Sequence, residues 1–587
     1  MASPSDYYPI VGIQDGLNPE KHEPLREVHL RMEVDDWFTS DKSIHANQRA
    51  LFFPALWKFS QMSPQEKLSW FQIAVVFEFM KEKISRYPGK DRPDLEEAAR
   101  TWRLPYWDWA LKKPVNGEQN RWDYSVPLAI LNKTVEIRQP GSEGLVPFKN
   151  ALYQFTMPGN IAMGDWSLRN GEQDLRVSAV TTPDKNIFPF EDFATERALD
   201  YGPKGKKEKK YVFGSGENIH DLMHINCGGN AQPDSQNICL GGHMAHVPVA
   251  AFDPIFWIHH CNVDRMTAIW QILHDDTWFD GEDPRDKDNG TYSIKEGHPD
   301  KPDDPLRPFH KEGGGYWTSS DVREVTALGY TYPGLEKWHY TTEGKYDKQK
   351  HLDALWKKLN WAYNSDWSAA QKSRLTANPG EPDGLKLARL SSLRGAPTDM
   401  FVDDYVVNVI YEKFELDGYP FEIHIFVGKV PDETPYKTGH AQVGQVVNFS
   451  VQPASLGDSG VGCGNCRRQQ ANHIKSTGCV ALTNALITRY KNQIQHENSD
   501  GGPSVLKSMG RADVVPFLKS NLHWRVTSRG VLVDLPSLKV SLAVGKAEHY
   551  ADRTKMSVYH AYKPAYEVTR GRPGGAEPGD YLYPPHR

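Results

Sequence analysis

The strongest structural signal in the chain is the stretch Phe252-Asp253-Pro254-Ile255-Phe256-Trp257-Ile258-His259-His260-Cys261-Asn262-Val263-Asp264-Arg265. Asp253 followed by Pro254 is typical of a helix start, because Asp caps the first turn and Pro fits the first helical position. His260 lies nearly two turns into this helix, with Phe256 and Asp264 four residues to either side on the same face. His259 points about 100° away from His260. One of the two histidines is therefore the better metal-ligand candidate.

A second histidine pair precedes this stretch. Within Glu217-Asn218-Ile219-His220-Asp221-Leu222-Met223-His224, the two histidines are four residues apart, so on a helix both rings share one face. Most such pairs are ordinary surface or core histidines, but this pair accompanies a second histidine-bearing helix. Three imidazoles suit copper, zinc or iron. The HDLMH tract also resembles the HExxH zinc motif with Asp in place of Glu, which leaves a zinc metallohydrolase as a remote alternative.

Upstream, the chain is mainly helical. Ser63-Pro64-Gln65-Glu66 is a capping box, and apolar residues at helical spacing predict one helix from there to about Ser85. Because this tract contains no Pro or Gly after the cap, we expect the helix to run unbroken through Ala74 and Val75.

Downstream, the pattern changes. Residues 336–400 are polar and rich in breakers, and predict a linker with one short helix. After residue 400 the apolar residues alternate, and Asp417-Gly418 predicts a hairpin between strands 406–414 and 421–427. We therefore predict an α+β protein: a mainly α-helical core over 1–335, a β-sandwich-like domain over 401–565 and a disordered tail over 566–587.

Composition narrows the function classes. The 587 residues carry a formal net charge of −6, which argues against a nucleic-acid-binding surface. No run of 18 apolar residues is present, so we expect no membrane-spanning helix. Six cysteines are too few for a disulfide scaffold, and the N-terminus lacks a signal-peptide pattern. We therefore expect an intracellular, cytoplasmic location.

Together these residues resemble the fungal tyrosinases, the intracellular latent type-3 copper phenol oxidases. The resemblance rests on the two histidine motifs and on three further tracts: LPYWDWA at 104–110, GHMAHVPVA at 242–250 and Gly329-Tyr330-Thr331-Tyr332-Pro333. It implies a four-helix-bundle copper site, with a C-terminal domain that shields it. It also implies ortho-hydroxylation of monophenols and oxidation of o-diphenols to o-quinones with O2, in pigment synthesis.

The resemblance also implies a role for each matching residue. The copper B ligands would be His220, His224 and His260. Phe256 would pack against the histidines, and Asp264 would orient a ligand or its helix. Around the substrate, Glu217 and Asp221 would hold a water that accepts the proton of a phenol, and Ile225 would line the mouth of the pocket.

Two features of the β-rich region match the shielding domain of the family. Cys463 and Cys466 resemble a copper-loading pair, although a C-x-x-C pair is also compatible with a zinc half-site, a redox pair or a plain structural pair. Phe449 is the candidate for an aromatic residue that occupies the substrate position. The alternative for Phe449 is an ordinary strand residue in the core of the sandwich.

The chain departs from the family at copper A. The family carries three further histidines between its first helix and LPYWDWA, whereas this chain has no histidine between His45 and His220. Phe71-Gln72-Ile73-Ala74 runs directly into Val75, and His22, His29 and His45 do not fit the pattern. The sequence therefore retains ligands for one copper of the expected two, and it is compatible with an active enzyme or with an impaired homologue that binds one copper or none.

Overall fold

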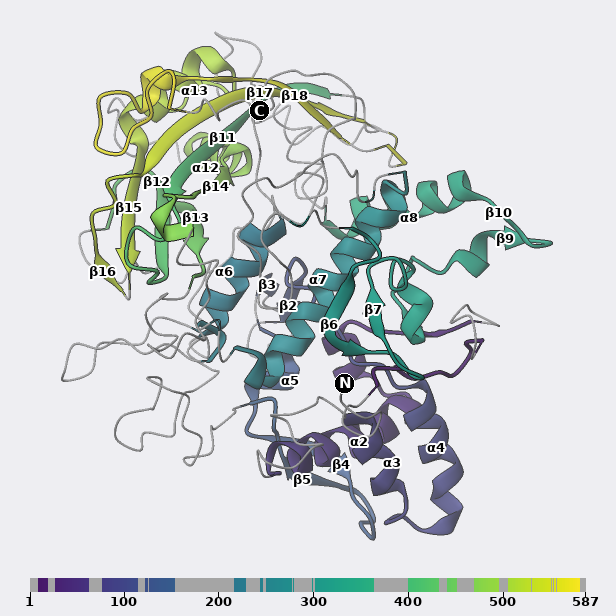
Figure 1. Cartoon of the computed structure of the whole chain (residues 1–587). Helices are drawn as coiled ribbons and strands as arrows, with labels where there is room; N and C mark the ends of the chain where they lie inside the picture. Colours follow the sequence, from purple (N-terminus) through teal and green to yellow (C-terminus); the bar gives the residue numbers. More distant parts are fainter. Residues whose placement is uncertain are drawn as a thin grey trace, which may run out of the picture.

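The structure is a computed structural model of the chain, shown in Figure 1. It describes residues 9–18, 27–62, 76–114, 122–124, 126–153, 216–228, 243–245, 247, 250–276, 278, 298, 301–363, 400–431, 441–450, 469–495, 505–528, 530–550, 552, 554–555 and 557–580. A helical part is followed by a part built on two sheets, which confirms the predicted α+β class. Within the described ranges, no helix combines the length and apolar character needed to cross a bilayer.

The N-terminal helices form one packed group. They are α1 (Val34–Thr39), α2 (Ser43–Ser60), α3 (Val76–Ile84) and α4 (Arg92–Thr101). Helix α2 packs against both α3 and α4, and buries Phe52, Phe53 and Phe59. The predicted helix ends close to where α3 ends, but residues 63–75 lie outside the described residues. The prediction of an unbroken helix across Ala74 and Val75 therefore stays a prediction.

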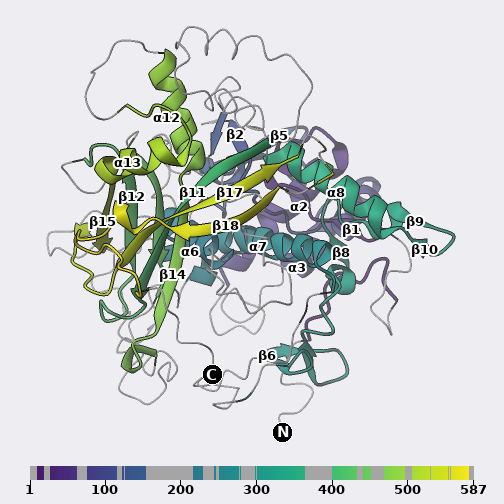
Figure 2. The ribbon, with the colours of Figure 1, turned by 90° about the horizontal axis from the view of Figure 1, so that it is seen from above.

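Two further helices carry the histidine motifs. They are α6 (Gly216–Gly228) and α7 (Pro254–Leu273), which confirms the two helices predicted between residues 217 and 274. The Asp253 side chain accepts a hydrogen bond from the Ile255 backbone N–H at 3.1 Å, and Pro254 is the first helical residue. The start of α7 is therefore set by local sequence, as predicted. Figures 1 and 2 both show α6 between α7 and the C-terminal sheets.

Short strand pairs and turns of 3-10 helix connect the helices. The pairs are β1 (His29–Leu30) with β8 (Tyr330–Thr331), β2 (Lys112–Pro114) with β3 (Trp122–Tyr124), β4 (Thr134–Arg138) with β5 (Leu145–Lys149), β6 (Pro305–His310) with β7 (Tyr316–Thr318), and β9 (Thr341–Thr342) with β10 (Lys345–Tyr346). The short helical segments are α5 (Leu128–Leu131), η1 (Gly89–Asp91), η6 (His243–Ala245), η7 (Ala250–Phe252), η8 (Val325–Leu328) and η9 (Lys337–Tyr340).

The short helix predicted within residues 336–400 is confirmed, but it packs into the helical part instead of lying in a free linker. Helix α8 (Lys348–Tyr363) buries Leu355 and Leu359 in the core of the helical part. Its other positions are mostly polar, and that composition made the segment resemble a linker. Residues 364–399 lie outside the described residues.

Two four-stranded sheets form the C-terminal part and share one apolar core. One sheet has the order β14 (Lys475–Ala481), β11 (Met400–Glu412), β17 (Lys539–His549) and β18 (Val558–Pro564). The other has the order β13 (Gln442–Asn448), β12 (Phe421–Val427), β15 (Leu522–Ser528) and β16 (Val531–Leu532). Helix α12 (Thr483–Gln495) contacts β11, and helix α13 (Arg511–Asn521) contacts β12.

The predicted hairpin between β11 and β12 is wrong. The turn exists, since Asp417 and Gly418 both have left-handed backbone conformations, with φ of 52° and 80°. The two strands nevertheless belong to different sheets, because β11 pairs with β14 and β17 while β12 pairs with β13 and β15. The Asp-Gly turn therefore makes the corner between the two sheets of the sandwich.

Strand β13 lies at the edge of its sheet and serves two cores. Val446 belongs to the core between the sheets, whereas its neighbour Val447 is buried in the core of the helical part. Successive residues of a strand face opposite ways, so one strand can take part in both cores. Because β13 also packs against α6, this strand connects the two parts of the molecule beside the histidine helices.

The predicted disordered tail over 566–587 is wrong for residues 566–580. They include the short helix η12 (Tyr566–Val568), and Val540 of β17 exchanges backbone hydrogen bonds with Gly574 and Ala576 at 2.7 and 2.8 Å. The Arg572 guanidinium lies over the Trp524 ring, 4.2 Å from its centroid. These contacts anchor a segment whose Gly- and Pro-rich composition predicted disorder. Residues 581–587 lie outside the described residues.

Candidate metal centre

Four histidines meet between α6 and α7. His220 and His224 come from α6, His259 and His260 come from α7, and one ring nitrogen from each lies within 4.8 Å of all the others. Within the described ranges this is the one group of three or more His, Cys, Asp or Glu side chains able to share a metal ion. The two motifs that the sequence analysis singled out therefore converge in space.

Three of the four rings have the spacing of a metal-ligand set. The Nε2 atom of His260 lies 3.3 Å from Nε2 of His220 and 3.2 Å from Nε2 of His224. Nitrogens bound at about 2.0 Å to one ion in tetrahedral directions are about 3.3 Å apart. The spacing of these nitrogens thus fits one ion held by His220, His224 and His260.

Hydrogen bonds on the far side of two rings present the correct nitrogen to the cluster. Nδ1 of His224 lies 2.9 Å from the backbone carbonyl of Met244, which can only accept, so this Nδ1 carries the proton and Nε2 offers its lone pair. Nδ1 of His220 lies 3.0 Å from the Asp221 carboxylate, which favours the same tautomer. Both Nε2 atoms are therefore ready to bind a cation.

The Asp221 carboxylate is thus a direct support for a candidate ligand, in addition to its predicted contact with a water. Its predicted partner Glu217 lies in the first turn of α6, and its side chain lies outside the described part of the structure. The pairing of these two carboxylates around a water stays a prediction.

The expectation that only one histidine of the His259–His260 pair faces the cluster is wrong. The His259 ring is stacked on that of His220, with centroids 5.4 Å apart and an interplanar angle of 18°. Two positions 100° apart on α7 can flank the line along which α6 packs, so both rings reach the same helix. His259 is fully buried, and neither of its ring nitrogens has a hydrogen-bond partner among the described residues. Burial, with the neighbouring histidines, lowers its pKa well below the usual value.

This donor set fits a metal that prefers nitrogen. Neutral imidazoles suit copper and zinc, and two of the rings have their tautomer selected from outside the cluster. His259 adds a further buried imidazole beside the three converging nitrogens, and neither of its own ring nitrogens has a hydrogen-bond partner among the described residues. The residues present therefore fit one copper ion.

Two phenylalanines cover rings of the cluster. Phe256, predicted to pack against the histidines, lies flat on His260 with ring centroids 3.9 Å apart. Phe449, which follows β13 directly, stacks on His224 with centroids 4.5 Å apart and an interplanar angle of 19°. Phe449 is packed against the core of the helical part, so it is not a strand residue of the sandwich core. The C-terminal domain therefore reaches the candidate metal centre.

Asp264 and Ile225 lie on the two histidine helices, Asp264 on α7 and Ile225 on α6. The Asp264 carboxylate accepts hydrogen bonds of 2.8 Å from the hydroxyls of Tyr330 and Tyr332, which ties α7 to the GYTYP tract. Arg31 reinforces this tie, with its guanidinium 3.7 Å from the Tyr330 ring centroid. Ile225 is buried in the core of the helical part, and its place at the mouth of the substrate pocket stays a prediction.

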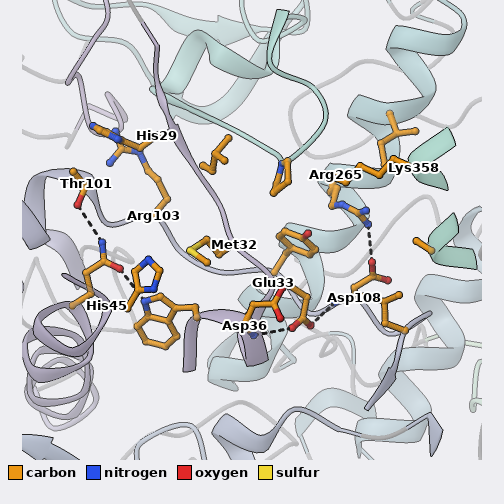
Figure 3. Close-up of a pocket in the computed structure, with 18 of the residues that line it drawn as sticks. His29, Met32, Glu33, Asp36, His45, Thr101, Arg103, Asp108, Arg265 and Lys358 are labelled. Atoms are coloured by element: carbon orange, nitrogen blue, oxygen red, sulfur yellow. Dashed lines mark hydrogen bonds and ion pairs between the residues drawn. The ribbon is translucent and has the colours of Figure 1, made fainter. Parts of the chain in front are cut away.

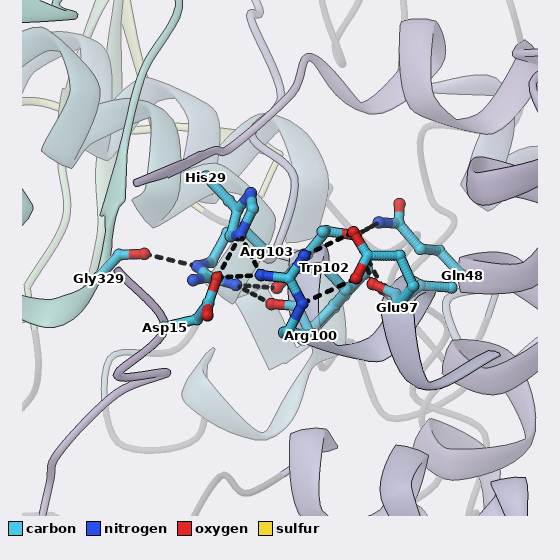
Figure 4. Close-up of polar contacts among 10 residues, drawn as sticks. Asp15, His29, Gln48, Glu97, Arg100, Trp102, Arg103 and Gly329 are labelled. Carbon is cyan, nitrogen blue, oxygen red and sulfur yellow. Dashed lines mark hydrogen bonds and ion pairs between the residues drawn. The ribbon is translucent and has the colours of Figure 1, made fainter. Parts of the chain in front are cut away.

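The upstream histidines, which do not fit the family pattern, are found away from the cluster where the structure describes them. His29 is paired with Asp15 at 2.7 Å (Figure 4). His45 is paired with Ser40, also at 2.7 Å. Neither supplies a second set of copper ligands. Cys463, Cys466 and His22 lie outside the described residues, so copper loading by the cysteine pair stays a prediction.

Two helices that present histidines to a common point, with a β-sandwich domain laid over them, define a histidine-ligated metalloprotein with a built-in cover. Residues 79–273 match the common central domain of tyrosinase, and residues 404–542 match the tyrosinase C-terminal domain. The chain belongs to the tyrosinase family of enzymes, whose members use copper.

Whole-chain comparisons agree. The tyrosinase of Aspergillus fumigatus is 26% identical over 671 aligned positions, covering 92% of this chain and 96% of that protein. Polyphenol oxidase 2 of Agaricus bisporus is 25% identical, covering 84% of this chain and 79% of that protein. The structure of recombinant mushroom tyrosinase aligns with a TM-score of 0.66 at 18% identity, covering 95% and 98%. The structure of the Aspergillus oryzae holo-protyrosinase aligns with a TM-score of 0.59 at 21% identity, covering 94% of this chain and 98% of that protein. These structures therefore share the fold of this chain.

Proposed function

We propose that this chain is a latent, single-copper member of the tyrosinase family, which holds its copper on His220, His224 and His260. The observation that carries the proposal is the three Nε2 atoms spaced 3.2 and 3.3 Å apart, in the one histidine cluster of the described residues. When bound, copper supplies a one-electron redox couple and a Lewis acid that favours phenolate over phenol.

Electron counting separates this proposal from full phenol oxidase activity. Oxidation of an o-diphenol to an o-quinone removes two electrons and two protons, whereas one copper accepts a single electron. The family reaction needs a second three-histidine set, and the sequence has no histidine between His45 and His220 to provide it. We infer that a phenol binds at this centre but is not converted to quinone at the rate of a two-copper enzyme.

The protein's own groups have defined tasks in this proposal. His220 and His224 hold their Nε2 lone pairs toward the ion because Asp221 and the Met244 carbonyl engage their Nδ1 atoms. A phenol has a pKa near 10 in water, so it needs a proton acceptor to bind as phenolate. Asp221 is the described carboxylate in contact with the cluster, and it is the acceptor that we propose. Phe449 lies on His224 and keeps phenols out until the C-terminal domain is displaced.

A second candidate function is the complete family reaction, hydroxylation of monophenols and oxidation of o-diphenols with O2. The near-complete alignment with tyrosinases favours it, since relatives are matched over 96% and 79% of their lengths. It requires a second copper whose ligands come from outside the described residues.

Copper stoichiometry together with turnover separates the two candidates. The full chain would be loaded with copper, its metal content measured by mass spectrometry, and oxidation of L-DOPA followed before and after limited trypsin digestion. We expect one copper per chain and no quinone formation above the rate of free copper. His260→Ala should lose the copper, whereas the matched control His298→Ala, away from the cluster, should keep it. Two coppers per chain with protease-activated quinone formation would establish the second candidate instead.

A further inference from the structure

A large cavity lies inside the helical part, away from the histidine cluster. Its volume is 590 Å³, within the range of small-molecule binding sites. Residues of α2, α7 and α8 line it, together with the segments around Met32 and Tyr106 (Figure 3). Arg265 and Ile269 are its contacts on α7. Arg265 is five residues, or about 140°, around the helix from His260. The cavity and the candidate metal centre therefore use different faces of the same helix.

The walls of the cavity are mainly apolar. Met32, Trp37, Ile269, Leu355 and Leu359 line it. Figure 3 shows Met32 between two polar ends, with His29, Arg103, Thr101 and His45 at one end and Arg265, Asp108 and Lys358 at the other. An apolar middle with few polar groups at its ends is the usual composition of a site for an organic molecule.

The buried carboxylates of the cavity are already engaged by the protein. Asp108 pairs with Arg265 at 3.2 Å, and both side chains are almost fully buried. Glu33 accepts hydrogen bonds from the backbone N–H groups of Asp35 and Asp108, at 2.7 and 3.3 Å. These acids are therefore not available to hold a cationic ligand.

The basic groups are less well compensated. Arg103 donates to the carbonyls of Gly329, Arg100 and Trp102, but its Nη2 is buried without a hydrogen-bond partner among the described residues (Figure 4). Burial lowers the pKa of Arg103 to about 10. Lys358, at the opposite end, has no ion pair with any residue in the described ranges, although the charge of Glu336 acts on it as well as that of Arg265. Both ends of the cavity thus carry cations that a negative ligand would stabilise.

The geometry points to a binding site for a small organic carboxylate with an aromatic or other apolar body, whose carboxylate is held by Lys358 beside Arg265. The apolar body would lie along Met32, Leu355 and Leu359. Lys358 is the preferred anchor because it is exposed at the surface and so remains accessible, whereas the Arg103 guanidinium is almost fully buried. This site is independent of copper and of phenol oxidation.

The test uses the full-length, metal-free chain and two probes of one shape. 1-Naphthoate carries the carboxylate and 1-naphthamide is its neutral analogue. Their affinities would be measured by titration calorimetry at pH 7.5 in the presence of a chelator, so that copper cannot bind the carboxylate. We expect naphthoate to bind at least tenfold more tightly than naphthamide, since a charge-assisted contact is added.

Two substitutions on α8 locate the site. Lys358→Gln should lower the affinity for naphthoate about tenfold and leave the affinity for naphthamide unchanged. The matched control is Lys357→Gln, on an exposed position that does not line the cavity, and it should change neither affinity. Ala362→Trp, which fills part of the cavity, should weaken both probes without a lower melting temperature. Equal affinities for the two probes, or an equal loss in Lys357→Gln and Lys358→Gln, would overturn the proposal, and so would full binding in Ala362→Trp.

Discussion

Replacing Phe449 by alanine removes the ring that lies on His224, and the effect on access to the metal centre can be worked out from that contact. The two rings are nearly parallel, with centroids 4.5 Å apart, and Phe449 is half-buried. A stacked aromatic pair contributes about 1 kcal/mol beyond burial. Half-burial of a large apolar side chain contributes about 1 kcal/mol more. The ring is therefore held over His224 by about 2 kcal/mol, and the uncovered form is about 3% of the population.

The assay is titration of the copper(II)-loaded chain with azide, followed by the absorbance of the copper–azide complex. If Phe449 must leave before azide binds, Phe449→Ala should raise the azide affinity about 30-fold. Phe449→Leu keeps much of the burial but loses the stack, so its affinity should rise about fivefold. Phe309→Ala, on an exposed Phe of β6, is the matched control and should equal the wild type. An azide affinity of Phe449→Ala within twofold of wild type would refute the view that this ring covers the site.

Three other substitutions test the support around the centre. Asp108→Asn leaves the Arg265 guanidinium buried without its counter-ion, so urea unfolding should show that the free energy of unfolding falls by about 3–5 kcal/mol. The control Glu324→Gln removes an exposed ion pair with Lys337 and should lower it by less than about 0.5 kcal/mol. Burial raises the pKa of Asp253 to about 7, so its contribution to stability is complete below the unfolded pKa near 4 and is lost as the pH rises to 7. Asp253→Asn keeps the helix cap and removes the charge, so its melting temperature should fall less than that of the wild type between pH 4 and pH 8. Asp221→Asn should weaken copper binding by about 10–100-fold in a chelator competition, because His220 loses a charged hydrogen-bond partner, whereas unchanged copper affinity would contradict that role.

Features that depend on local sequence were predictable. The start of α7 follows from Asp253 and Pro254, and the facing histidines of α6 follow from their four-residue spacing. The position of His259 was not predictable from the helical angle, because that angle says nothing about where the neighbouring helix crosses. In the same way, Asp417-Gly418 correctly indicated a turn, but the choice of sheet for each flanking strand depends on partners far along the chain.

The other differences come from contacts over long sequence separations. Arg265 and Asp108 are 157 residues apart, and neither motif by itself indicates that they form a buried pair. Residues 566–580 have a composition typical of disorder, yet backbone hydrogen bonds to Val540 hold them against β17. Helix α8 was predicted as a helix, but its burial of Leu355 and Leu359, with Trp356 and Ala362 packed against the core, was not evident from a largely polar segment.

The position of β13 at the edge of its sheet has a consequence for the fate of the C-terminal domain after proteolysis. While the two parts are joined, α6 and the helical core cover the face of β13 that carries Val447. Once detached, the domain would present an apolar edge strand to water, with unpaired backbone groups along one side. Such an edge recruits further strands, so the liberated fragment should self-associate and precipitate. Removal of the C-terminal domain would then be irreversible, because the precipitated domain could not bind the helical part again.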